Sequence, residues 1–268
     1  MSRDTHEQRL AKTIEIAEQA GKMILRARQE QRFGQRLKAG EELVTDIDVA
    51  VDRFISEALE TAFPGEARLS EELAPEQQEV GSGPLWVVDP IDGTVNFAHG
   101  LRHVAVSIGW MEEGVTQVGV VHAPFLDETF TALKGQGAWR NGVAIAPSHT
   151  SVLEHALVAT GFPYQREQRK HLLPRLTKVL ANCRDVRRNG AAALDICDIA
   201  CGRLDAYYES VSPWDFVAGW LIAKEAGARA GHLIEVPEGT PEDIFSRELL
   251  VTAPGVFEAM RTLLQDEA

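Results

Sequence analysis

The sequence predicts a mixed fold of α-helices and β-strands (α/β, or α+β), in which helices and strands form stacked layers. Three observations lead to this prediction. The chain begins with two amphipathic helical patterns, continues with a series of short apolar strands, and ends with strands and helices in alternation. The pattern changes near residue 147, so we expect one compact structural unit with a soft boundary between residues 1–147 and 148–268.

The first third of the chain contains both helical patterns. Apolar residues recur at helical spacing over residues 4–30. Residues 31–42 are polar and contain glycine, and we expect a mobile loop there. A second helix is predicted over residues 46–62, with Thr45 as its N-cap and Asp48, three residues later, completing a variant of the capping box.

A strand meander is predicted for the middle of the chain. A short strand leads to Ser70, and an apolar run starting at Leu85 indicates a buried strand. Asn141 and Gly142 form the dipeptide that is typical of a two-residue hairpin turn. The other predicted strands of the meander cover residues 104–110, 118–121 and 129–133.

The last part of the chain alternates between strands and helices. Short β-rich runs are separated by longer segments with helical periodicity, and Gly227 is placed to end one of the helices. The predicted strands cover residues 156–160, 185–188, 204–209, 233–236 and 249–252, and the predicted helices cover residues 164–180, 190–201, 212–226 and 255–265.

Composition excludes several classes of function. Of the 268 residues 44% are apolar, which is enough for a sizeable core, and the net charge of −13 disfavours nucleic acid as a partner. No run approaches the ~18 apolar residues of a membrane span, and the N-terminus lacks a secretory pattern. The three cysteines are sparse, so we expect reduced thiols in a cytoplasmic protein.

The most informative segment follows the predicted buried strand. Asp89 and Asp92 stand at the end of that strand, and Gly93 and Thr94 then begin a short helix. Two carboxylates beside a helix N-terminus suit a divalent cation that holds a phosphate. The alternative is structural, because Asp-Pro and Asp-Gly are common turn dipeptides and Asp is a good N-cap.

Three further acids could join these two, although each taken alone has a structural explanation. Glu71 could be a solvated charge, Asp48 a helix cap and Asp215 an N-cap. Carboxylates that converge from separate segments repel one another and stay ionised only with cations between them. A set of oxygen ligands favours magnesium or manganese over zinc, and bound cations would let an acidic protein bind an anionic substrate.

The chemistry expected of such a site is hydrolysis of a phosphate ester. Bound metal ions would activate water and stabilise the leaving oxygen. The N–H groups of Gly93 and Thr94 would hold phosphoryl oxygens, and Thr94 with Asp48 would orient the water. No nucleophile elbow, phosphate-cradling cysteine or nucleotide-binding glycine loop offers another mechanism.

Together these motifs resemble the inositol monophosphatase family of magnesium-dependent phosphatases. The strongest matches are residues 86–97 (WVVDPIDGTVNF) and 214–219 (WDFVAG). The motifs follow the family's order over nearly the whole chain. Supporting matches lie in residues 43–48 (LVTDID), 70–72 (SEE), 135–142 (GQGAWRNG) and 190–195 (GAAALD).

The resemblance implies a layered α/β/α/β/α sandwich of the inositol monophosphatase and fructose-1,6-bisphosphatase type. It also implies two or three bound Mg²⁺ ions, with Mn²⁺ as an alternative, inhibition of the enzyme by lithium, and assembly as a homodimer. By this analogy one ion is bound by Glu71, Asp89 and the Ile91 carbonyl. A second ion is bound by Asp89, Asp92 and Asp215, and Glu71 faces a third. Asp48, Thr94 and Glu71 are the implied catalytic residues. The implied substrate contacts are Asp92, Gly93, Thr94, Gly190, Ala191, Ala192, Glu209 and Asp215.

This sequence departs from the family pattern at three places. Ser70 replaces a common glycine, the link from Glu209 to Trp214 is one residue shorter, and Arg102 and His103 replace apolar or proline residues. The residues expected to bind metal match the family pattern, whereas the residues expected to contact the alcohol portion of the substrate match no single subfamily.

The leading hypothesis is a phosphomonoesterase for a small polyol phosphate, with myo-inositol 1-phosphate as the best single candidate. Histidinol phosphate and fructose 1,6-bisphosphate are the alternatives, and 3′-phosphoadenosine 5′-phosphate ranks last. A second hypothesis, a regulatory or binding protein that retains the fold, is disfavoured because Glu71, Asp89, Asp92 and Asp215 are all present.

Overall fold

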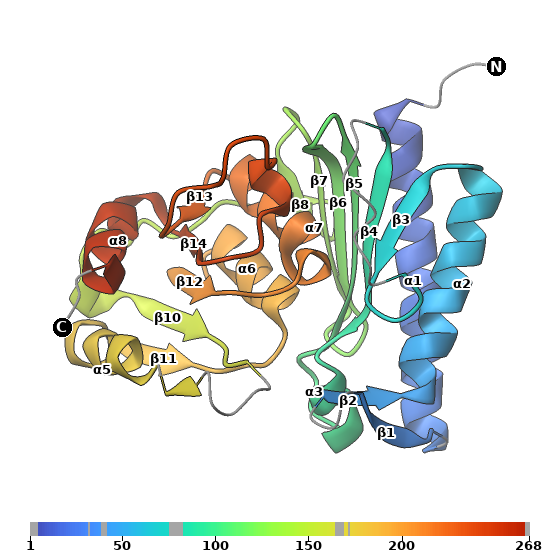
Figure 1. Cartoon of the computed structure of the whole chain (residues 1–268), viewed down its shortest axis with the longest axis horizontal. Coiled ribbons are helices and arrows are strands. Elements are labelled where there is room, and N and C mark those ends of the chain that lie inside the picture. The colour runs from blue at the N-terminus through green and yellow to red at the C-terminus, as the bar shows by residue number, and fades with distance from the viewer. Residues whose placement is uncertain are drawn as a thin grey trace.

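Two large β-sheets and three helical layers alternate across the molecule in the order α/β/α/β/α, and a separate hairpin forms a small two-stranded sheet (Figure 1). This computed structural model describes residues 5–31, 33–38, 42–74, 83–163, 169–170 and 172–265. The predicted fold class is confirmed. The core consists of three apolar clusters. One surrounds the central helical layer between the two sheets, one lies between the N-terminal helices and the larger sheet, and one lies between the smaller sheet and its outer helices.

The first layer contains α1 (His6–Glu30) and α2 (Asp46–Ala62), which cover the outer face of the larger sheet. The capping box predicted for Thr45 and Asp48 is present. The prediction of a mobile loop over residues 31–42 is wrong where the structure describes it. Strands β1 (Gln35–Lys38) and β2 (Glu42–Thr45) pair antiparallel there. Buried Val44, together with a Phe33 ring 4.8 Å from the ring of Phe97, anchors the hairpin.

The larger sheet has seven strands in the order β3-β4-β5-β6-β7-β8-β9. Only the β3–β4 pair is parallel, and the rest of the sheet is the predicted antiparallel meander. Asn141 and Gly142 make the predicted two-residue turn, both with positive φ. The strands are β3 (Ala67–Ser70), β4 (Leu85–Asp92), β5 (Ala105–Glu112), β6 (Val115–Ala123), β7 (Glu128–Leu133), β8 (Ala138–Arg140) and β9 (Val143–Ala144).

The central layer is formed by α6 (Ala192–Ala200) and α7 (Pro213–Ala226), which lie between the two sheets (Figure 1). Helix α7 comes very close to β5 and β6. A Cβ on Gly119 would lie 2.7 Å from the Ala218 carbonyl oxygen, and one on Gly109 would lie 2.8 Å from a methyl of Val217. Glycine at both positions is therefore what lets α7 reach the cavity described below.

The smaller sheet has the order β11-β10-β12-β14-β13, with α5 (Leu173–Asn182) and α8 (Phe257–Gln265) on its outer side. Its strands are β10 (Leu157–Thr160), β11 (Asp185–Arg187), β12 (Ala206–Glu209), β13 (Arg229–His232) and β14 (Leu249–Thr252). Further helical segments among the described residues are α3 (Thr94–His99) and the 3₁₀ turns Leu153–His155, Glu242–Ile244 and Pro254–Val256.

Two predicted elements of this part differ from the structure. The strand expected over residues 233–236 lies earlier, at β13, where Gly231 pairs with Leu250. Leu233 is buried without belonging to a strand, so its apolar character misled the prediction. The helix expected over residues 164–180 begins at Leu173, while residues 164–168 and 171 lie outside the described part.

No helix within the described part of the chain is both long enough and apolar enough to cross a membrane.

Candidate active site

A cavity of about 570 Å³ opens where β4 ends, and segments from both halves of the chain line it. All but one of the predicted site residues line this cavity, and the exception is Asp48, which lies behind Thr94. The predicted residues in the lining are Glu71, Asp89, Ile91, Asp92, Gly93, Thr94, Gly190, Ala191, Ala192, Glu209 and Asp215.

Three carboxylates meet at the floor of the cavity. Asp89 and Asp92 come from β4, whose pairing with β5 shifts register between these two residues. Asp215 comes from the first turn of α7, where it accepts a hydrogen bond of 2.7 Å from the Ser212 N–H. One oxygen from each of the three carboxylates lies within 4.8 Å of the other two.

The local electrostatics of these acids favour a bound cation. Burial, and then the charges of Glu71, Asp92 and Asp215, raise the pKa of Asp89 well above its ordinary value. Burial and the charge of Asp215 raise the pKa of Asp92 in the same way, although the Ala193 N–H opposes the shift. Because every donor is a carboxylate oxygen, the set fits a hard divalent cation, and the residues present can hold such an ion.

Asp92 also connects the acids to the central helical layer. Its two carboxylate oxygens accept hydrogen bonds from the first amides of α6, at 3.1 Å from the Ala192 N–H and 2.7 Å from the Ala193 N–H. A carboxylate at a helix N-terminus is favoured by the helix dipole. This contact aligns α6, with its preceding Gly190–Ala191 turn, against the end of β4.

Gly93 makes the turn between β4 and α3. Its φ is 96°, and a Cβ at this position would lie 2.9 Å from the His103 carbonyl oxygen. Only glycine fits such a turn without strain. No side chain in the described residues caps α3, and Gly93 and Thr94 both line the cavity, so the start of this helix faces the space beside the acids.

Asp48 and Thr94 form a buried pair. The Thr94 hydroxyl donates to Asp48 Oδ1 at 2.8 Å and also lies 3.2 Å from the Ile91 carbonyl oxygen. Asp48 Oδ2 accepts from the N–H and the hydroxyl of Thr45 at 2.8 and 2.5 Å. Burial raises the pKa of Asp48 despite these hydrogen bonds. The carboxylate is thus fully oriented and is a better proton acceptor than an exposed aspartate.

Glu209 lies on the opposite wall of the cavity. The Tyr207 hydroxyl donates to Glu209 Oε2 at 2.6 Å, and the carboxylate packs so closely on Gly161 that a Cβ there would overlap it. Burial raises the pKa of Glu209 to about 7, although the hydrogen bond from Tyr207 opposes this change.

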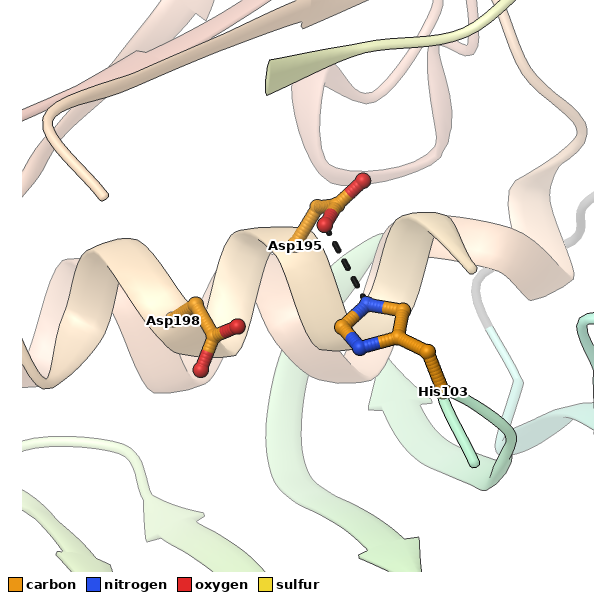
Figure 2. A group of neighbouring side chains, drawn as sticks. All are labelled: His103, Asp195 and Asp198. Atoms are coloured by element: carbon orange, nitrogen blue, oxygen red, sulfur yellow. Dashed lines mark hydrogen bonds and ion pairs between the residues drawn. The ribbon is translucent and has the colours of Figure 1, made fainter. Parts of the chain in front are cut away.

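A polar network supports the segment that begins α6. Figure 2 shows the His103 ring directed at Asp195, with Asp198 one turn further along the same helix. His103 Nε2 lies 3.2 Å from Asp195 Oδ1, which also accepts from the Asn189 amide at 2.7 Å. The Asn96 amide bonds the carbonyl oxygens of both His103 and Asn189 at 2.7 Å, so this network joins α3 to α6.

Sequence reasoning missed three features of the site. Asp52 lies one helical turn after Asp48, and its carboxylate accepts hydrogen bonds from the turn after Glu71. Arg188 and Arg247 line the cavity. The histidine at position 103 was noted only as a departure from a pattern. The spacing of Asp48 and Asp52 was the one available signal for any of these.

Comparisons with known proteins agree with this geometry. A sequence model of the inositol monophosphatase family matches residues 6–267. A tomato (Solanum lycopersicum) protein named inositol monophosphatase 2 is 37% identical over 260 residues, which is 94% of this chain and 96% of that protein. The Escherichia coli K12 protein named Nus factor SuhB is 35% identical over 232 residues, covering 86% of this chain and 85% of its own. The crystal structure of extragenic suppressor protein suhB from Bartonella henselae superposes with a TM-score of 0.86 at 30% identity, over 96% of this chain and 98% of that one.

Proposed function

Because the chain belongs to the inositol monophosphatase family, we propose that it is a magnesium-dependent phosphomonoesterase acting on a small polyol phosphate. The observation that carries this proposal is the meeting of Asp89, Asp92 and Asp215 beside the Asp48–Thr94 pair. The acids come from two elements that are far apart in the sequence, β4 and α7, and the mutual repulsion of their charges has no structural benefit for a protein that binds no cation.

The residues proposed to hold metal ions follow the family pattern. Glu71, Asp89 and the Ile91 carbonyl would hold one ion, Asp89, Asp92 and Asp215 a second, and Glu71 would face a third. Magnesium, or manganese in its place, would supply charge neutralisation for the phosphate and a lowered pKa for a bound water.

The chain's own residues position the reaction. The first N–H groups at Gly93 and Thr94 would hold phosphoryl oxygens. The Thr94 hydroxyl donates a hydrogen bond to Asp48, so a lone pair on its oxygen can accept a proton from an attacking water while the Thr94 proton passes to Asp48. The raised pKa of Asp48 supports this role, because a buried carboxylate takes up a proton more readily than an exposed one.

The alcohol portion of the substrate would lie against Gly190, Ala191, Ala192 and Glu209. The Ala192 N–H already donates a hydrogen bond to Asp92. We therefore propose that Ala192 makes a van der Waals contact with the substrate rather than a hydrogen bond from its amide. myo-Inositol 1-phosphate is the first substrate to test, with histidinol phosphate and fructose 1,6-bisphosphate as alternatives.

A phosphate-release assay tests the proposal. Purified protein is treated with a chelator and then assayed on these three substrates with Mg²⁺, with Mn²⁺ and without metal. We expect turnover that depends on added metal. Absence of turnover on all three substrates would refute the phosphatase assignment.

The Asp92→Asn variant tests the metal assignment. We expect kcat to fall about a hundredfold or more, because the amide cannot replace an ionic ligand. The matched control is Asp127→Asn, an exposed residue with positive φ that Asn also tolerates, and its kcat should not change. Near-normal turnover of Asp92→Asn would show that the ligand set is wrong.

A regulatory role is the second candidate, supported by the relative named Nus factor SuhB. The complete acid set favours catalysis, since a protein retained only for binding has no need of Glu71, Asp89, Asp92 and Asp215 together. Lithium inhibition, a homodimer and a cytoplasmic location belong to the same proposal and are supported by the family resemblance alone.

A further inference from the structure

Two arginines line the cavity away from its acidic floor. Arg188 follows β11 and Arg247 precedes β14, and both are exposed. Within the described residues, neither guanidinium forms an ion pair or a hydrogen bond. In a protein with a net charge of −13, two arginines in this cavity that lack such a partner among the described residues call for an anionic ligand.

Arg188 lies between the turn that starts α6 and the opposite wall. Its Nη1 is 2.5 Å from the place where a Cβ on Gly190 would be, so the guanidinium covers that glycine. The charge of Arg188 also acts on Glu209, whose pKa it lowers against the effect of burial. The guanidinium therefore stands over the part of the cavity assigned to the alcohol.

Arg247 borders the same part from the other side. The Val211 N–H donates to the Ser246 carbonyl oxygen at 3.0 Å, and the Glu248 N–H donates to the Ser210 hydroxyl oxygen at 2.9 Å. These bonds place Arg247 beside the short link that joins Glu209 to Trp214. This link is one of the places where the sequence departs from the family pattern.

The nearby acids do not cancel the charge of these arginines. Asp195 already accepts hydrogen bonds from His103 and Asn189. Glu209 accepts from Tyr207, and burial raises its pKa to about 7, which disfavours its charged form. The remaining acids lie on the floor, where the proposed metal ions would neutralise them.

We propose that Arg188, with Arg247 on the other side of the same part of the cavity, binds a second anionic group on the alcohol portion of the substrate. The preferred substrates are then phosphate monoesters whose alcohol also carries a carboxylate or another phosphate. A guanidinium suits either group, since its planar N–H fork matches the oxygens of both. The cavity of about 570 Å³ is in the usual range for small-molecule sites and larger than one phosphate requires. The inference rests on the proposed phosphatase function.

Two matched substrate pairs test this inference. Glycerol 2-phosphate and 2-phosphoglycerate differ by replacement of a hydroxymethyl with a carboxylate, and fructose 1-phosphate and fructose 1,6-bisphosphate differ by a second phosphate. The measured quantity is the kcat/KM of the substrate with two anionic groups divided by the kcat/KM of its partner, whose only anionic group is the phosphate that is cleaved. The variants are Arg188→Gln and, as a charge-matched control, Arg184→Gln, an exposed arginine outside the cavity lining.

We expect a ratio of about ten or more in at least one pair, because a charge-assisted hydrogen bond contributes about 1.5–3 kcal/mol. The pair that shows it identifies the anionic group. Arg188→Gln should bring that ratio down by about tenfold, and Arg184→Gln should keep the wild-type ratio. Measurable turnover with ratios near one in both pairs, or an unchanged ratio in Arg188→Gln, would overturn the inference while leaving the phosphatase function intact. Wild-type protein that hydrolyses none of these substrates, nor myo-inositol 1-phosphate, would instead refute the proposed function.

Discussion

At the scale of single residues, the site depends on side chains whose positions are restricted by several hydrogen bonds. Asp48 accepts from Thr45 through both backbone and hydroxyl and from the Thr94 hydroxyl. Asp92 accepts from two amides of α6. Such groups need little reorganisation when charge changes during a reaction, which is the main way in which preorganised sites stabilise transition states.

Replacing Thr94 by valine tests the proposed proton path. Valine keeps the shape of the side chain but removes the hydroxyl that contacts Asp48. We expect kcat to fall about a hundredfold or more, the range typical of a lost general base, with KM little changed. Steady-state kinetics at saturating Mg²⁺ measures both constants. A fall in kcat/KM that comes only from a higher KM would assign Thr94 to substrate binding instead.

His103 provides a pH-dependent contribution to stability. Burial disfavours its charged form, but the hydrogen bond and charge of Asp195 and the charge of Asp198 outweigh this, so the pKa of His103 is raised. Protonated His103 therefore favours the folded state. The contribution is complete below the unfolded pKa of about 6.5 and is lost as the pH rises through the folded pKa.

The His103→Gln variant measures this contribution. Its loss of unfolding free energy relative to wild type should be larger by about 1 kcal/mol near pH 5.5 than near pH 8.5. Urea denaturation at the two pH values provides the measurement. Equal losses at both values would show that the ion pair with Asp195 does not form.

At the scale of secondary structure, α2 connects two parts of the site. Asp48 in its first turn holds Thr94, and Asp52 one turn later is fully buried. Asp52 Oδ2 accepts from the N–H groups of Glu72 and Leu73 at 3.1 and 3.0 Å. One helix thus sets the distance between the proposed proton acceptor and the turn that presents Glu71.

The Asp52→Asn variant tests this positioning role. The amide oxygen can still accept both hydrogen bonds but lacks the charge, so the turn carrying Glu71 should be held less firmly. Outer residues that orient metal ligands typically change metal affinity by about 10- to 100-fold, and we expect an effect in this range. Calorimetric titration with Mg²⁺ measures the affinity without relying on turnover.

The matched control for Asp52→Asn is again Asp127→Asn, which should bind Mg²⁺ as the wild type does. Unchanged affinity in Asp52→Asn, with only a lower melting temperature, would mean that Asp52 stabilises the fold and has no influence on Glu71.

At the scale of the whole molecule, the cavity lies where the two halves of the chain meet. Asp89 and Asp92 belong to the seven-stranded sheet, whereas Asp215 and Glu209 belong to segments after residue 147. We propose that the sequence boundary near this residue separates an N-terminal part with most metal ligands from a C-terminal part with Asp215 and the alcohol contacts. Neither part alone contains the complete cavity lining.

Removal of metal should therefore weaken the whole structure. The buried acids repel one another, and a cation between them removes that repulsion in the folded state only. At a concentration about a hundredfold above its dissociation constant, Mg²⁺ should add about 2.7 kcal/mol of stability. Thermal unfolding after chelation and after re-addition of Mg²⁺ tests this. The Asp92→Asn variant should lose most of the increase, and an increase of equal size in that variant would contradict the assignment.

Much of the fold and site could be predicted because the signals are local. The capping box of Thr45 and Asp48, the two-residue turn at Asn141 and Gly142, and the buried strand that ends at Asp92 each depend on neighbours within a few residues. The predictions that were wrong involve distant partners. The β1–β2 hairpin depends on Phe33 meeting Phe97, and β13 is a strand because it pairs with β14 rather than because of its own apolar pattern.

The sequence by itself determined which acids are present, their order and the family they indicate, because these are properties of short motifs. Only the tertiary structure decided that Asp215 meets Asp89 and Asp92, since close approach of α7 requires Gly109 and Gly119 in strands far along the chain. It alone also decided that Asp52 holds the turn after Glu71 and that Arg188 covers Gly190. Burial, charge coupling and shared space between distant residues arise only when the layers pack, so no local pattern records them.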